Sequence, residues 1–156
     1  PGGCTRLAFA ADGQLHFGGG AAAGRGMALG RMSPVGPTGF EVKSVKALAD
    51  GFELTFTQPV DAASAANVAG YEIAAFTYQH GAGPGVEHDF EGQPNQVSKL
   101  RVSAAVVGGD ALSARLVVPG LRAGVVTRVR AAGVRSAASQ PLRHDTFFYT
   151  LNELPK

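Results

Sequence analysis

The sequence predicts an all-β protein, an antiparallel β-sandwich with a β-hairpin in front of it. Three observations lead to this prediction. Short segments beyond residue 40 alternate apolar and polar side chains, as strands with one buried face do. Turn signals such as Asp50-Gly51 and Pro119-Gly120 separate these segments. The 22 glycines and nine prolines follow no collagen-like period and therefore indicate many turns.

Residues 1–39 form the first predicted region. Two β-like runs, at 6–10 and 14–17, flank Asp12-Gly13, which is a strong hairpin signal between alternating apolar residues. The stretch that follows, "GGGAAAGRGMALGRMSPVGPTG", has a glycine every few residues, so we expect no long regular structure there. Because an isolated hairpin is only marginally stable in water, this region needs a partner surface.

Residues 40–156 form the second predicted region, which contains about seven strands. In the first clear strand Phe52, Leu54 and Phe56 face one side and polar residues face the other. The strands are expected at 41–48, 52–57, 71–78, 98–106, 112–118, 125–131 and 146–151. The fourth of these would turn one apolar face to the core, made of Leu100, Val102, Ala104 and Val106. Short strands separated by turns are typical of a two-sheet sandwich.

The segment "QPVDAASAANVAGY" is predicted to be a corner between two strands. Pro59 ends the strand before it, because proline cannot donate to a sheet ladder. Asp61 can cap one helical turn with its carboxylate. Tyr71 begins the next strand and is expected to plug the end of the sandwich. Nothing in this corner requires chemistry.

Composition and charge exclude several classes of function. The 156 residues suffice for one domain, or for one domain and a fragment, and the opening Pro1 in place of methionine leads us to expect a piece of a longer protein. The net charge is only +2 and the basic residues are scattered, so we expect no nucleic-acid binding. No apolar run approaches the roughly 20 residues of a membrane span. Cys4 is the only cysteine, which excludes an internal disulfide and a Cys-x-x-Cys-His haem site.

The best local candidate for a site is the loop "YQHGAGPGVEHDFEG". His80, His88 and Asp89, together with Glu87 and Glu91, could hold a divalent metal, because imidazole and carboxylate groups are common ligands. The flexible spacing between the two histidines offers no rigid i,i+2 or i,i+4 presentation. A solvated loop without metal is therefore the interpretation that the spacing favours.

Other candidates are weaker. His144-Asp145 is not expected to be a catalytic dyad, because adjacent residues of an extended chain point to opposite faces. Several aromatic residues could line a platform for carbohydrate, although packing between the sheets is the role we favour; they are Phe76, Tyr78, Phe147, Phe148 and Tyr149. No nucleophile, base and orienting group come together, so no catalytic residue is predicted.

The segments "DGFELTFTQPVDAASAANVAGYEI" and "TFFYTLNELPK", with "AADGQLHFGGG" and "LGRMSPVGPTGFEVKSVKAL", resemble the C-terminal region of large bacterial glucose/sorbosone dehydrogenase-like β-propeller proteins. The resemblance covers nearly the whole chain and is most specific at residues 50–73 and 146–156. It implies that residues 1–39 are the remnant of a last propeller blade with a glycine-rich linker. It further implies that residues 40–156 are a bacterial Ig-like domain, an Ig-like or fibronectin III-like sandwich.

The resemblance also implies a function. Such proteins are typically exported, so a periplasmic or extracellular location is expected. In that family pyrroloquinoline quinone and a catalytic histidine belong to the propeller, and haem c to a separate domain. No position here matches those residues, so this chain is expected to hold no cofactor. It would be a non-catalytic portion that supports or docks on the propeller of a quinone-dependent sugar dehydrogenase-like oxidoreductase. Relatives carry a tyrosine- and histidine-containing loop near Phe76, Tyr78 and His80, which implies a contact surface for the propeller there.

Two other hypotheses remain open at this point. The chain could be a stand-alone Ig-like module that binds carbohydrate or a cell-surface protein. It could also be an autonomous enzyme, which the absence of a catalytic constellation disfavours.

Overall fold

The computed structural model describes residues 4–20, 27–33, 35–79 and 85–155. The chain divides into two compact units, Pro1–Thr38 and Gly39–Lys156. Strands dominate both units, and the only helices in the described ranges are the short α1 (Ala62–Ala66) and η1 (Val68–Gly70). The predicted all-β class is therefore confirmed. None of the described helices is long and apolar enough to cross a membrane.

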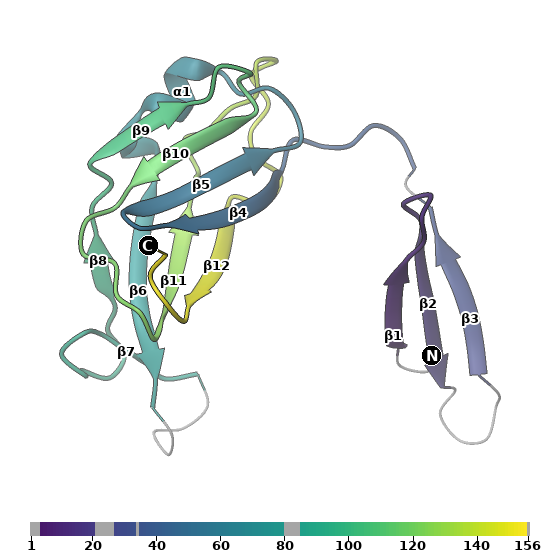
Figure 1. The fold of residues 1–156 in the computed structure, drawn as a ribbon, viewed down its shortest axis with the longest axis horizontal. Coiled ribbons are helices and arrows are strands. Elements are labelled where there is room, and N and C mark those ends of the chain that lie inside the picture. The colour runs from purple at the N-terminus through teal and green to yellow at the C-terminus, as the bar shows by residue number, and fades with distance from the viewer. Residues whose placement is uncertain (1–3, 21–26, 34, 80–84, 156) are drawn as a thin grey trace. The chain divides into compact units, whose positions relative to one another are not determined.

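The first unit is a three-stranded antiparallel sheet in the order β1-β2-β3, formed by β1 (Cys4–Phe9), β2 (Leu15–Gly20) and β3 (Met27–Met32) (Figure 1). The predicted hairpin is confirmed. The Gly13 N–H donates to the Ala10 carbonyl oxygen at 2.9 Å, and the positive φ of 78° at Gly13 suits a residue without Cβ.

The expectation that the glycine-rich stretch has no long regular structure is wrong, because Met27–Met32 of that stretch form β3. Gly18 and Gly19 pair with Leu29 and Ala28 across the ladder. Ladder hydrogen bonds use backbone groups only, and glycine supplies these as other residues do. At Gly30, where a Cβ would collide with the ring of Phe17, that ring covers the bare backbone.

The second unit is a sandwich of two antiparallel sheets (Figure 1). One sheet has the order β4-β5-β10-β9, with bounds β4 (Val42–Leu48), β5 (Gly51–Phe56), β10 (Ser113–Val117) and β9 (Ala104–Val107). The other has the order β12-β11-β6, with bounds β12 (Thr146–Leu151), β11 (Val125–Arg130) and β6 (Glu72–Tyr78). Beyond β6 this sheet continues with two short strands that both pair with it, β7 (Glu87–His88) and β8 (Ser98–Leu100).

The strand order bears on the Ig-like prediction. Without the two short strands, the remaining seven can be lettered A to G along the chain, which makes the sheets A-B-E-D and G-F-C. Immunoglobulin constant-type sandwiches have this order. The sandwich itself is confirmed, and the Ig-like assignment stays a prediction.

The core lies between the two sheets and contains the predicted faces. Phe52, Leu54 and Phe56 of β5 are buried, with Phe56 stacked on Phe40 at 5.7 Å between ring centroids. Alternate residues of β10 and β11, with the residue that follows each strand, are buried as expected: Ala114, Leu116, Val118, Val125, Thr127, Val129 and Ala131. The period-2 pattern therefore identified the inward faces of three central strands.

The strand predicted at 98–106 is wrong in one respect. The structure divides it into β8, which pairs with β6, and β9, which pairs with β10 in the other sheet. Val102 lies buried at the crossing between the sheets. The alternation then shifts by one residue, so that Val106 is 59% exposed while Ala105 and Val107 pack against the core.

The corner before β6 is formed as predicted. The Asp61 carboxylate accepts the Ser64 N–H at 2.8 Å and so caps α1. Tyr71 is buried, and its hydroxyl donates to the Ala65 carbonyl oxygen at 2.7 Å. Burial raises the pKa of this hydroxyl above its ordinary value of 10.0, because the phenolate would lose its hydration. Tyr71 thus plugs the corner as a neutral side chain.

Candidate functional site

His88 and Asp89 lie in regular local structure: His88 is packed in a short strand, and Asp89 stabilises a turn. His88 is 3% exposed, pairs with Thr77 through β7, and has Nδ1 3.1 Å from the Val86 carbonyl oxygen. The solvated-loop interpretation is thus wrong for His88, because β7 adds to the edge of the sheet. The Asp89 carboxylate accepts the Glu91 N–H at 3.1 Å and the Gln93 N–H at 2.8 Å, which closes a turn.

These two residues do not converge on a metal site. Among the residues that the structure describes, no group of three His, Cys, Asp or Glu side chains could hold a metal ion. His80 was predicted both as a metal ligand and as part of a contact surface, and it lies outside the described residues.

The predicted aromatic surface divides into buried and exposed rings. Phe76 is fully buried, edge-on to Tyr78 at 5.4 Å between ring centroids. The prediction that Phe76 belongs to a contact surface is therefore wrong. Phe147 and Tyr149 pack against the core, which confirms the packing role we favoured for them. Tyr78 is 57% and Phe148 60% exposed, so the packing role is wrong for these two rings.

His144 and Asp145 have separate partners, which fits the prediction that they form no dyad. The His144 Nδ1 lies 2.9 Å from Oε1 of Glu41, whose other oxygen accepts the His144 backbone N–H at 3.1 Å. The pKa of Asp145 is lowered, first by the hydrogen bond from the Thr146 hydroxyl and then by Arg130.

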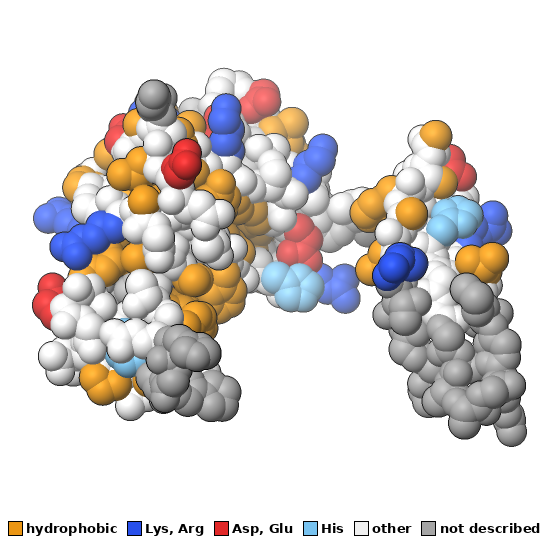
Figure 2. Space-filling model, turned by 60° about the horizontal axis from the view of Figure 1, so that its bottom comes forward, with side chains coloured by type: hydrophobic (Ala, Val, Ile, Leu, Met, Phe, Trp, Pro, Cys, Tyr) orange, Lys and Arg blue, Asp and Glu red, His pale blue; other side chains and the backbone are white. Residues whose placement is uncertain are grey.

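One face of the first unit's sheet is apolar, and several of its large side chains are exposed. The ladder register places Leu7 and Phe17 side by side, and likewise Phe9, Leu15 and Met32. Leu7 is 64%, Phe9 77% and Met32 58% exposed, and Figure 2 shows hydrophobic side chains at the surface of this unit. We call this surface the apolar face; the opposite face of the sheet carries His16, Arg31 and the exposed Leu29.

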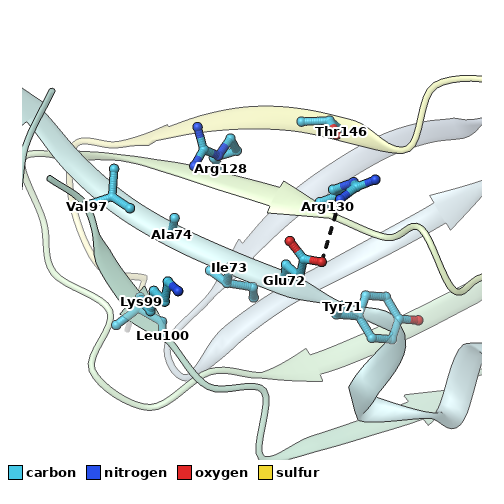
Figure 3. Close-up of a pocket in the computed structure, with 10 residues that line it drawn as sticks. All are labelled: Tyr71, Glu72, Ile73, Ala74, Val97, Lys99, Leu100, Arg128, Arg130 and Thr146. Carbon is cyan, nitrogen blue, oxygen red and sulfur yellow. Dashed lines mark ion pairs between the residues drawn. The ribbon is translucent and has the colours of Figure 1, made fainter. Parts of the chain in front are cut away.

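A hollow of about 590 Å³ lies on the sheet that contains β6, β8, β11 and β12, mostly on its outer face, with ten lining residues drawn in Figure 3. Ala74 forms part of the wall. Its ladder partners are Lys99 on β8 and Arg128 on β11, which therefore stand on either side of a methyl group. A larger residue in place of Ala74 would fill the space between the two cations. We call this feature the outer hollow.

The charges around the outer hollow are unequally neutralised. The Arg130 guanidinium lies 3.2 Å from Asp145 and 3.6 Å from Glu72. Arg128 forms a longer ion pair, 3.8 Å from Glu87. Within the described ranges Lys99 has no acidic partner at ion-pair distance, so Lys99 and, to a smaller degree, Arg128 are the least neutralised charges of the hollow.

The alternation of basic and apolar residues on β11 had indicated an outward face, and this is confirmed for Arg128 and Arg130. The hollow itself was missed, because its two cations come from strands separated by about thirty residues of sequence and meet only through the ladder. The signal that could have found it is an alanine among larger residues on the outward face of β6.

Comparisons with known proteins yield similar folds. No family model matches the chain, and no curated protein does. Among solved structures, the bacterial S-layer protein rSbsC(31-844) has 24% identity and a TM-score of 0.53, over 72% of this chain and 14% of that one. Domains 1–6 of SbsC have 23% identity and a TM-score of 0.52 over 71% of this chain. At these identities the likeness shows the fold alone, and the chain spans only a small part of those proteins.

Proposed function

We propose that this chain is a non-catalytic β-sandwich module of an exported protein, docked through its first unit on a β-propeller of the glucose/sorbosone dehydrogenase-like kind. The apolar face carries the proposal. Three of its large side chains are more than half exposed, whereas the sandwich buries the apolar face of its strand β5 between two sheets.

The energetics of the apolar face favour a partner surface of the β-sheet kind. Burying an exposed Leu, Phe or Met side chain contributes roughly 1.5–3 kcal/mol of favourable free energy. Several such residues together would therefore strongly favour docking. Propeller blades are four-stranded antiparallel sheets arranged around a central channel. A three-stranded sheet such as β1-β2-β3 is one strand short of such a blade, and a neighbouring blade would cover its apolar face.

The proposed location is outside the cytoplasm, at the cell surface or in the periplasm. The resemblance to exported propeller proteins supports it, and so does the similarity in fold to domains of bacterial S-layer proteins. A second candidate function is a stand-alone module that binds carbohydrate or a cell-surface protein. The outer hollow favours this second candidate, because it lies on the sandwich and needs no propeller.

The test begins with the encoding DNA. We expect the reading frame to continue upstream into repeated Asp-Gly-x-Leu blades. In that longer protein Phe9→Ser on the apolar face should lower stability by about 2–3 kcal/mol, since it removes one docked ring. His16→Ser on the opposite face is the matched control and should change stability by no more than about 0.5 kcal/mol. Thermal and urea unfolding measure both.

Two results would contradict the proposal. An upstream sequence without blades, or equal effects of Phe9→Ser and His16→Ser, would remove the docking role. Reduction of a redox dye by the present chain alone, with sugar and pyrroloquinoline quinone added, would overturn its non-catalytic nature.

A further inference from the structure

We propose that the outer hollow binds an acidic polysaccharide, with the carboxylate of a uronic acid residue held between Lys99 and Arg128. The inference is independent of the docking function, because it concerns the sandwich and not the apolar face of the first unit. It rests on the ladder register, on the charges left open in the hollow, and on an exposed aromatic ring beside it.

The register places the two cations in one row across the sheet. Lys99, Ala74 and Arg128 are ladder partners on β8, β6 and β11, in that order. Adjacent strands are about 4.8 Å apart, so the two cationic residues start about 10 Å apart with only a methyl group between them. Figure 3 shows Arg128 and Lys99 on opposite sides of Ala74. A carboxylated sugar can enter that gap and reach both charges.

The charges available in the hollow favour an anion. Arg130 already has two acidic neighbours, while Lys99 has none in the part of the chain that the structure describes and Arg128 has one at 3.8 Å. A guanidinium can bind a carboxylate through two parallel hydrogen bonds, and an ammonium adds a mobile point charge. Lys99 and Arg128 can therefore share one carboxylate, because Lys99 has no acidic partner among the described residues and the Glu87 carboxylate lies 3.8 Å from Arg128.

The surroundings favour a sugar over an acidic peptide. Phe148 is the ladder partner of Arg128 on β12 and is 60% exposed, so its ring is open to solvent next to the cation. The electron-rich face of an aromatic ring attracts the weakly positive C–H groups on a sugar ring. Thr146 and Val97 line the hollow as well, which supplies a hydroxyl oxygen, whose hydrogen is donated to Asp145, and an apolar wall. The hollow of about 590 Å³ lies within the range of small-ligand sites.

The test uses the full chain and isothermal titration with oligogalacturonate, an acidic glycan. Maltohexaose, which is uncharged, and poly-glutamate, an acidic peptide, are the comparison ligands. We expect binding of oligogalacturonate, and at least about tenfold weaker binding of both comparison ligands, since a change of tenfold corresponds to the loss of one good polar contact. Equal binding of poly-glutamate would overturn the glycan assignment, and no binding of oligogalacturonate would overturn the site.

Substitutions then locate the site. The double variant Lys99→Gln, Arg128→Gln should weaken binding at least about tenfold. Lys43→Gln with Lys46→Gln is the matched control, because it removes the same charge from two exposed lysines on β4 in the other sheet. Equal losses in the two double variants would mean that net charge alone attracts the glycan, which would contradict the proposal.

Two further variants separate shape from charge. Ala74→Leu fills the space between the two cations without changing charge and should also abolish binding, with circular dichroism and thermal unfolding to verify the fold. Phe148→Ser removes the aromatic ring from an exposed edge position and should weaken binding of oligogalacturonate about tenfold. Unchanged affinity in both variants would overturn the assignment to this hollow.

Discussion

The two units of this protein use the same alternation of side chains with opposite results. In the sandwich, the apolar residues of β5 and β11 face a second sheet and are buried. In the first unit, Leu7 and Phe9 of β1 share a face with Met32 of β3, yet all three remain more than half exposed. Alternation thus defines a face in both units, but only a second layer makes that face a core.

The comparison also separates two ways in which these sheets accommodate glycine. Gly51 in the sandwich lies where β5 approaches the backbone of β10, and Gly30 in the first unit lies under the ring of Phe17. Backbone is fixed by the ladder on both sides, whereas a half-buried ring can rotate. Replacing glycine by alanine is therefore expected to cost more stability at Gly51 than at Gly30.

The largest expected difference between the units concerns phenylalanine. Phe56→Ala should lower the free energy of unfolding by about 3–5 kcal/mol, because it leaves a cavity beside Phe40 in the core. Phe9→Ala in the present chain should change it by no more than about 0.5 kcal/mol, because this ring is exposed. Urea unfolding followed by circular dichroism measures both, with Thr55→Ala as an outward-facing control on β5. Similar costs for the two phenylalanines would show that Phe9 is not exposed in this chain.

A smaller difference is expected for glycine. Gly51→Ala should cost about 1–3 kcal/mol, because the added Cβ would collide with the Leu116 carbonyl oxygen of the neighbouring strand. Gly30→Ala should cost less than about 1 kcal/mol, because the Phe17 ring can turn aside. The same unfolding measurement applies, and a larger cost at Gly30 than at Gly51 would contradict the explanation.

The smallest expected effect concerns Tyr71, whose hydrogen bond closes the corner of the sandwich. Tyr71→Phe should cost about 1–2 kcal/mol at neutral pH, since the buried Ala65 carbonyl loses its hydroxyl donor. The pKa of Tyr71 is raised in the folded state, so above its ordinary value of 10.0 the unfolded chain releases this proton while the folded chain keeps it. Stability should therefore fall as pH rises beyond 10, and less steeply in the variant. Unfolding free energies from about pH 9 to 11 measure this slope, and parallel slopes would show that Tyr71 does not cause the loss.

Several local features were predictable from the sequence because nearby residues produce them. Asp12-Gly13 indicated the hairpin, Asp61 the capped helical turn, and the spacing of Phe52, Leu54 and Phe56 the buried face of β5. Each depends on residues within a few positions of one another. Such patterns remain readable without knowledge of the rest of the fold.

The candidate sites were less predictable. His88 and Asp89 were weighed as metal ligands, and the structure places the first in a short edge strand and the second at a turn. Phe76 and Phe148 are both aromatic and both on the second sheet, yet one is buried and the other is exposed. Their difference depends on what covers each position, and no local pattern contains that information.

The sequence by itself determined the class of fold, the presence of many short strands and the inward side of most of them. Only the tertiary structure decided that residues 98–106 divide between two sheets, that a glycine-rich stretch supplies β3, and that Lys99 and Arg128 stand across Ala74. The physical reason is the range of the interactions. Side-chain alternation follows from the geometry of one strand, whereas ladder partners and covering layers are chosen by the free energy of the whole packed domain.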